Sequence, residues 1–176
     1  MIDDEAPPTA PFSIRPARPR DARAVRELFA AVAAEGRWIR TERVVRSTGE
    51  FRRRARDAWS YEGAFLVAEA DGRIVGNLRI AREGQEATRH VASFGMHVAR
   101  DWRGRGVGTA LLVEALRWAR AVGVRKVELA VYPDNEAARA LYARMGFVEE
   151  GRLLRHSRLS SGYRDEVLMG LWLGDA

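Results

Sequence analysis

The amino-acid sequence predicts an α/β (α+β) fold in which helices flank one mixed sheet. Two apolar runs meet at Asp71-Gly72, a tight-turn signal that indicates an antiparallel hairpin. Residues 89–132 follow the order strand, helix, strand, and this order requires a crossover between two roughly parallel strands. Residues 153–171 again form two strand-like runs around a Ser-Ser-Gly turn. Parallel and antiparallel pairing are therefore expected in the same sheet.

The expected strands are short runs in which apolar residues alternate with polar ones or follow one another. The first is closed by Pro16, because proline lacks the N–H that a ladder of backbone hydrogen bonds needs. We expect strands over residues 12–17, 64–70, 73–80, 89–98, 126–132, 147–150, 153–158 and 163–171.

Four segments are expected to be helical. Asp21 is expected to cap the first, whose apolar residues recur at spacings of three and four until Gly36. The arginine-rich segment 38–61 has a weaker pattern and is expected to form a helix or a helix and a loop. Gly123 ends the third helix. The expected helices are residues 21–36, 38–61, 106–122 and 136–145.

The length and hydrophobic content of the chain favour a single domain. The chain has 176 residues, of which 47% are hydrophobic, enough to bury a core. Residues 1–11 contain three prolines and several acids and are expected to be a mobile lead-in to a domain covering residues 12–176. No run of about 18 apolar residues is present, and the start is acidic where a signal peptide is basic. A cytoplasmic protein without a membrane partner is expected.

Composition limits the possible chemistry. The chain has no cysteine, which excludes disulfides, thiolate metal sites and a cysteine nucleophile. Its three histidines, His90, His97 and His156, show no metal-ligand spacing, so no metal is expected. The net charge is +6, but 29 of the 30 basic residues are arginines spread among 24 acids. We therefore expect no specific nucleic-acid partner, although a basic surface attracts anionic cofactors.

The segment Arg103–Gly108, called the glycine loop below, lies between an expected strand and an expected helix. Three alternate glycines allow backbone N–H groups to face a ligand, and the helix that follows presents unpaired amides at its positive end. Two arginines add phosphate-binding groups. The pattern indicates a site for the pyrophosphate of a nucleotide-containing cofactor; taken alone, it also fits a glycine-rich connection that binds nothing.

Two other nucleotide motifs do not fit the glycine loop. A nicotinamide-binding pattern needs glycine at position 109, where this chain has threonine, and an acid at a strand end, whereas Glu128 lies inside an expected strand. A Walker loop needs a lysine after its glycines, and none follows. Further along, Asn135 and Tyr142 are seven residues apart on one expected helix and share a face. They are candidates for ligand contact, or only a helix cap and a packed aromatic ring.

The glycine loop, Asn135 and the segment Tyr142-Ala143-Arg144-Met145-Gly146-Phe147 together resemble the GNAT superfamily of acetyl-CoA-dependent N-acetyltransferases. The loop is similar to its (Gln/Arg)-x-x-Gly-x-(Gly/Ala) motif, and the later segment to its Asn…Tyr-x-(Arg/Lys)-x-Gly-Phe signature. The resemblance covers residues 12–172. It implies a central mixed, mostly antiparallel sheet of about seven strands flanked by about four helices. The C-terminal part is similar to bacterial amino-acid and small-amine N-acetyltransferases.

The resemblance also implies roles for particular residues. Backbone groups of Met96 and Val98 would pair with the pantetheine arm of acetyl-CoA, and Asn135 would hydrogen-bond it. Tyr142 would protonate the leaving thiolate and contact the cofactor. The backbone amides expected to surround the pyrophosphate are those of Arg103, Gly104, Arg105, Gly106, Val107, Gly108 and Thr109.

The expected reaction is direct attack of a primary amine on the acetyl thioester, with an amino acid or another small amine as acceptor. A base or a water chain must take the proton of the amine. Some family members carry a glutamate where this chain has His90-Val91-Ala92-Ser93, so the base is left open. Its candidates are His90, Ser93, His97, Glu69 and Glu83. The candidates for an acceptor pocket are Trp38, Trp59, Tyr61, Tyr132, Tyr163 and Asp165.

Two alternatives remain open at this point. One is acetylation of protein N-termini or lysines, and the other is a non-catalytic acyl-CoA-binding module. Exposed strand edges near the C-terminus also make a homodimer an expectation.

Overall fold

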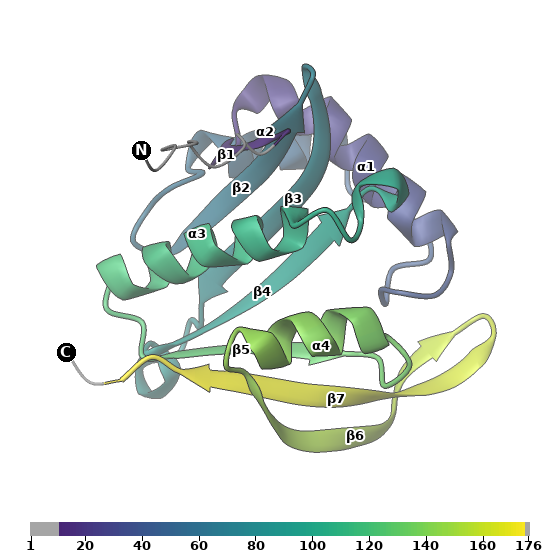
Figure 1. The fold of residues 1–176 in the computed structure, drawn as a ribbon, viewed down its shortest axis with the longest axis vertical. Helices are drawn as coiled ribbons and strands as arrows, with labels where there is room; N and C mark the ends of the chain where they lie inside the picture. Colours follow the sequence, from purple (N-terminus) through teal and green to yellow (C-terminus); the bar gives the residue numbers. More distant parts are fainter. Residues whose placement is uncertain (1–10, 175–176) are drawn as a thin grey trace, which may run out of the picture.

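The computed structural model describes residues 11–174, and the predicted lead-in, residues 1–11, lies outside the described residues except for its last residue. Within the described part, seven strands form one sheet in the order β1-β2-β3-β4-β5-β7-β6 (Figure 1). Neighbouring strands are antiparallel except for β4 and β5. The predicted mixed, mostly antiparallel sheet is confirmed. The strands are β1 (Ser13–Pro16), β2 (Gly63–Ala70), β3 (Arg73–Arg82), β4 (Val91–Val98), β5 (Lys126–Val131), β6 (Val148–Leu159) and β7 (Gly162–Trp172).

Four α-helices within residues 11–174 accompany the sheet, as predicted. None of them is long and apolar enough to cross a membrane. Helices α1 and α2 pack on one face of the sheet, and α3 packs on the other against β2 and β3. The helices are α1 (Ala22–Ala34), α2 (Thr48–Arg56), α3 (Val107–Ala121) and α4 (Glu136–Arg144).

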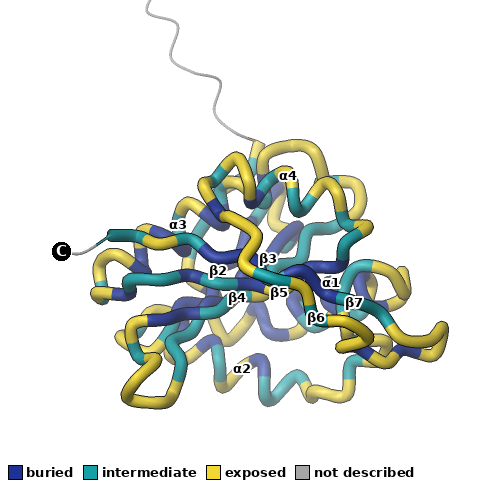
Figure 2. Tube along the Cα trace, turned by 90° about the horizontal axis from the view of Figure 1, so that it is seen from below, coloured by how far each residue is buried: buried dark blue, intermediate teal, exposed yellow. Residues whose placement is uncertain are grey.

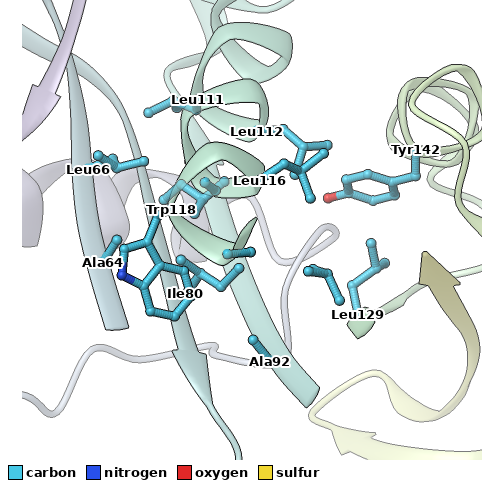
Figure 3. Packing of buried hydrophobic residues seen from close by; sticks show 14 of the residues in the cluster. Ala64, Leu66, Ile80, Ala92, Leu111, Leu112, Leu116, Trp118, Leu129 and Tyr142 are labelled. Atoms are coloured by element: carbon cyan, nitrogen blue, oxygen red, sulfur yellow. The ribbon is translucent and has the colours of Figure 1, made fainter. Parts of the chain in front are cut away.

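Successive side chains of strand β2 point alternately into two hydrophobic cores, one on each face of the sheet. Its even-numbered residues, such as Leu66, pack with Leu111 and Trp118 of α3 (Figure 3). Its odd-numbered residues Phe65 and Val67 pack with α1 and α2. Buried residues accordingly follow the central strands, whereas the connecting loops are exposed (Figure 2). A period of two along one strand thus fixes which helices cover each face.

One predicted helix start and one predicted helix cap are corrected. Ser47 accepts a hydrogen bond from the Glu50 N–H, and the Glu50 carboxylate accepts one from the Ser47 N–H at 2.8 Å, so α2 begins only at Thr48. The side chain of Asp21 does not cap α1. Its carboxylate instead accepts from the Arg15 guanidinium at 2.6 Å and from the Arg18 N–H at 2.7 Å.

The C-terminal strands also differ from the prediction. Residues 147–150 and 153–158 were expected as separate strands, but the structure has one strand, β6, over Val148–Leu159. Its register with β7 shifts twice, between Glu149 and Gly151 and between Leu153 and Ser157. These irregularities let β6 stay paired with β7 on both sides of Gly151, the residue that separates the two predicted strands.

Gly76 tests the packing of α3 on the sheet. A Cβ at this residue of β3 would lie 2.9 Å from Val107 Cγ1 and 3.1 Å from Leu111 Cδ1. Gly76→Ala is therefore expected to lower the free energy of unfolding by about 1–3 kcal/mol in chemical denaturation. The matched control is Gly84→Ala, because a Cβ there meets no heavy atom of the described residues within 4 Å. Equal stability of the two variants would contradict this packing.

Candidate active site

Strands β4 and β5 separate soon after they meet. They pair in parallel over Val91–Ser93 and Lys126–Glu128 and then diverge (Figure 1). A cavity of about 840 Å³ extends between the diverging strands. It is lined by α1 and the loop after it, the second half of β4, the glycine loop, the second half of β5, the start of α3, α4, and Glu166 of β7. Both faces of the sheet therefore contribute to one cavity.

Backbone groups of β4 face this gap. In an antiparallel pair, the N–H and C=O of alternate residues face the partner strand, and those of the residues between them face away. The Ala99 N–H donates to the Val75 C=O at 2.9 Å, so odd-numbered residues of β4 face β3. The backbone groups of Met96 and Val98 consequently face the gap, where Arg103 Nε donates to the Val98 C=O at 3.1 Å. This edge is available to an extended ligand.

The glycine loop ends in the first turn of α3. Gly104 and Gly106 have positive φ angles of 74° and 82°, a conformation that side chains disfavour. A Cβ on either glycine would meet no heavy atom of residues 11–174 within 4 Å, so the loop surface is open. The first N–H bonded within α3 is that of Ala110, which donates to the Gly106 C=O at 3.0 Å. The amides of residues 107–109 are thus free of helical partners at the positive end of the helix dipole.

The three non-glycine residues of the glycine loop, Arg103, Arg105 and Val107, have different surroundings. Arg103 lines the cavity, and its guanidinium donates to both carboxylate oxygens of Glu35 at 2.6 and 2.8 Å. These bonds hold the pKa of Glu35 below its usual range. The guanidinium of Arg105 lies 5.2 Å from the ring centre of Trp102, and Val107 is 1% exposed in the core. For Val107 the backbone is therefore the part suited to ligand contact, whereas the side chain of Arg105 is exposed and has no ion pair within residues 11–174.

Tyr142 is on α4 and lines the cavity. Its ring packs against Phe94 and Phe147, with ring centres 5.7 and 5.9 Å apart. In Figure 3 the ring points from α4 toward α3. Burial raises the pKa of the Tyr142 hydroxyl to about 12. The hydroxyl is consequently protonated at neutral pH and can donate a proton.

Asn135 precedes α4 and also lines the cavity. Its Oδ1 accepts a hydrogen bond from the Ala138 N–H at 3.3 Å, so it caps the helix. The structure therefore brings Asn135 and Tyr142 to one cavity, together with part of the glycine loop. The loop and helix residues that line it are Arg103, Gly104, Gly106, Gly108 and Thr109.

The predicted acceptor pocket is only partly correct. Trp38 and Tyr132 line the cavity, whereas the other four candidates lie outside it. Asp165 faces away, where Arg152 of β6 pairs with it at 2.9 Å. The exposed fractions of the remaining three are 39% for Trp59, 57% for Tyr61 and 64% for Tyr163.

Of the predicted base candidates, only His97 lines the cavity. The other four engage residues elsewhere: Glu69 pairs with Arg15, Ser93 donates to Glu83, and His90 packs on Trp172. His97 is half-buried and packs against Phe29, with ring centres 4.6 Å apart. Its Nδ1 is buried and has no hydrogen-bond partner among the described residues. Burial lowers the pKa of His97 to about 4, so the ring is neutral at neutral pH.

Two cavity residues, Arg40 and Glu166, were missed in the prediction from the sequence. Glu166, 1% exposed, accepts hydrogen bonds from Arg40 and Ser157. Burial alone would raise the pKa of Glu166, but these two donors outweigh it and leave the pKa below its usual range. The Tyr132 hydroxyl is buried beside them without a partner among residues 11–174. A charged residue such as Glu166 within an apolar strand indicates a buried functional group only if its side chain points inward. The sequence alone does not show which face of the strand is the inward one.

The burial of His97 predicts a pH dependence of stability. Its pKa is lowered from 6.5 to about 4, so the unfolded chain binds the proton more tightly than the folded one. Stability is therefore lost as the pH falls from about 6.5 to about 4, by about 3 kcal/mol for this group, and is unaffected at higher pH. In urea denaturation over this range, His97→Phe is expected to show a smaller loss than the wild type, and the control His90→Gln the full loss. Equal slopes for His97→Phe and the wild type would contradict the burial.

The chain is similar in sequence to acetyltransferases of one family. Residues 30–147 match the model of the acetyltransferase (GNAT) family. The chain is 36% identical over 108 residues to the L-amino acid N-acetyltransferase AaaT of Escherichia coli, covering 59% of this chain and 65% of AaaT. It is 36% identical over 105 residues to the N-alpha-acetyltransferase RimI of Mycobacterium tuberculosis, covering 60% of this chain and 65% of RimI. Each match thus spans less than two thirds of the relative.

A solved structure shows the likeness over nearly the whole chain. The GNAT-family acetyltransferase of Streptococcus pneumoniae superposes with a TM-score of 0.86 at 28% identity, covering 93% of this chain and 99% of that one. The match to the family model includes the glycine loop, Asn135 and Tyr142. The chain belongs to the GNAT family of acetyltransferases.

Proposed function

We propose that this protein transfers the acetyl group of acetyl-CoA to the primary amine of an amino acid or another small molecule. The observation that carries the proposal is the meeting of three features in one cavity: the unpaired edge of β4, the glycine loop at the start of α3, and the protonated hydroxyl of Tyr142. The first suits an extended polar chain, the second a pyrophosphate and the third a leaving group that needs a proton.

The described residues fit acetyl-CoA along its length. The open surface of Gly104 and Gly106 leaves room for phosphates close to the backbone. The amides of residues 107–109 donate toward them. Backbone groups of Met96 and Val98 extend the β4 ladder to the pantetheine amides, and the side chain of Asn135 adds a polar contact from the opposite wall.

Acetyl-CoA supplies an acetyl thioester, and the chain positions the amine and moves the protons. The amine nitrogen forms a C–N bond with the acetyl carbon as the C–S bond breaks. A backbone N–H of β4, from Met96 or Val98, stabilises the negative charge on the carbonyl oxygen. Tyr142 donates its proton to the leaving sulfur. Among described residues, Glu166 is the carboxylate that lines the cavity, and Arg40 already binds it, so we infer that water takes the proton of the amine.

The acceptor side lies around Trp38, Tyr132 and the ion pair of Arg40 with Glu166. An amino acid is favoured because the relative AaaT is named for acetylating L-amino acids. The relative RimI is named as an N-alpha-acetyltransferase, which keeps protein N-termini as a second acceptor class. Both classes present a primary amine next to a carbonyl group.

A thiol-release assay tests the function. Acetyl-CoA and the protein are mixed with a panel of amino acids, polyamines and peptides with free N-termini, and free CoA thiol is followed. Release that depends on an amine, with a product heavier by one acetyl group, is expected. Acetyl-CoA binding without thiol release for any amine would instead indicate an acyl-CoA-binding module.

The Tyr142 hydroxyl is predicted to affect kcat rather than acetyl-CoA binding. Tyr142→Phe keeps the ring packing against Phe94 and Phe147 but removes the proton donor. We expect kcat to fall by about 100-fold or more with little change in acetyl-CoA affinity. Tyr163→Phe is the control, since Tyr163 is 64% exposed and outside the cavity. Weaker acetyl-CoA binding at unchanged kcat would remove Tyr142 from the acid role.

Gly106 is predicted to act on acetyl-CoA binding. Gly106→Val places a β-branched residue at φ 82° and a side chain on the open loop surface, which is expected to weaken acetyl-CoA binding about tenfold or more in calorimetry. Gly123→Val imposes the same strain, at φ 75°, beyond the other end of α3. It is expected to lose stability but retain affinity. If both variants bind acetyl-CoA equally well, the loop does not hold the pyrophosphate.

A further inference from the structure

A second cavity, of about 220 Å³, adjoins the first on the face of the sheet that α1 and α2 cover. The two cavities share Phe29, Gly95 and His97. These three residues therefore place the two cavities next to each other. The second cavity is lined by Phe29, Arg46, Phe51, Arg54, Phe65, Asn77, Arg79, Gly95 and His97.

Three arginines from three segments line this second cavity. Arg46 precedes α2, Arg54 is on α2, and Arg79 is on β3. None of the three has a carboxylate within salt-bridge distance in residues 11–174. The carboxylate whose charge acts on Arg54 is Glu50, and it is engaged with Ser47 in the cap of α2. The cavity thus concentrates positive charge.

The arginines also destabilise one another. Desolvation lowers the pKa of Arg79, and the charge of Arg46 lowers it further. Desolvation also lowers the pKa of Arg54, together with the charges of Arg79 and Arg46. Like charges held close together without a counter-ion cost free energy, and a bound anion removes that cost.

The cavity wall offers polar atoms as well as charge. Asn77 is 5% exposed, and its Oδ1 has no hydrogen-bond partner among the described residues. The same holds for the buried Nδ1 of His97. Phe29, Phe51 and Phe65 form the apolar part of the wall. Unpartnered buried polar groups beside a cavity indicate a polar occupant, because leaving such groups without hydrogen bonds is costly.

We propose that the second cavity binds an anionic group, a carboxylate or a phosphate, of the acceptor molecule while its amine lies in the first cavity. The proposal rests on the proposed function and narrows the acceptor to amines that carry an anion in addition to the α-carboxylate that every amino acid has. Forked guanidinium donors match carboxylate and phosphate oxygens, and three positive charges match one or two negative ones. The shared residues Phe29, Gly95 and His97 place the two cavities side by side, within the span of one small molecule that passes beside Gly95.

Anion binding is measured first, without turnover. The full chain is first saturated with CoA, so that the glycine loop is occupied. Calorimetric titration with inorganic phosphate and with glutarate is then expected to show saturable binding. The double variant Arg54→Gln/Arg79→Gln is expected to bind these anions at least about tenfold more weakly, because charge-assisted hydrogen bonds are lost. It is also expected to be at least as stable as the wild type, since repulsion is removed. The control Arg52→Gln changes an exposed arginine of the same helix outside the cavity and is expected to bind normally. Equal anion binding by the double variant and the wild type would overturn the site.

Matched acceptors then identify the source of the anion. Glutamate is compared with glutamine, and phosphoserine with serine. The member with the additional side-chain anion is expected to have a KM about tenfold lower than its partner, and the double variant to remove the difference without changing kcat for glutamine or serine. Phosphate is expected to compete with the anionic amine. Equal KM values, or anion binding without competition, would overturn the assignment to the acceptor. Anion binding that the double variant loses, with no amine acetylated, would refute the proposed function and leave the anion site standing.

Discussion

The separation of β4 from β5 after Ser93 positions every part of the candidate site. Each strand keeps one neighbour, β3 for β4 and β7 for β5, and the facing edge of each is left without a ladder. Backbone N–H and C=O groups on such an edge need partners from water or a ligand. The glycine loop and α4 enter beside the same gap, which places Gly106 and Tyr142 on one cavity. Extended pairing of β4 with β5 would close the sheet and leave no site.

The loop after α1 connects the two ends of this cavity. Glu35 at the end of α1 accepts hydrogen bonds from Arg103 of the glycine loop and from Trp38 Nε1 on the acceptor side. In this arrangement the guanidinium of Arg103 is already neutralised by Glu35, so the anion-binding capacity of the loop rests on its backbone amides, the start of α3 and the exposed guanidinium of Arg105. The same loop places Arg40 on Glu166. The acceptor side is thus held by contacts between segments that are far apart in the sequence.

Sequence reasoning located the features that local chemistry specifies. Asp71-Gly72 marks the hairpin and the spaced glycines mark the loop, because these conformations require those residue types. Trp38 and Tyr132 were named as candidates for the proposed acceptor side, but its ion pair was missed because it is a long-range contact: Arg40 and Glu166 are 126 residues apart. Asp165 was chosen and Glu166 was not, although they are adjacent, because a strand points successive side chains to opposite faces and the sequence does not say which face is inward. Asp21 failed as a cap for a similar reason, since Arg15 competes for its carboxylate.

Amide hydrogen exchange in the presence of acetyl-CoA tests the role of the β4 edge most directly. The N–H groups of Met96 and Val98 face the gap, whereas those of Gly95 and His97 face β3 and serve as internal references. Saturating acetyl-CoA is expected to slow exchange at Met96 and Val98 and to leave Gly95 and His97 nearly unchanged. Unchanged exchange at Met96 and Val98 with acetyl-CoA bound would show that the cofactor does not pair with this strand, and would contradict the account of the site.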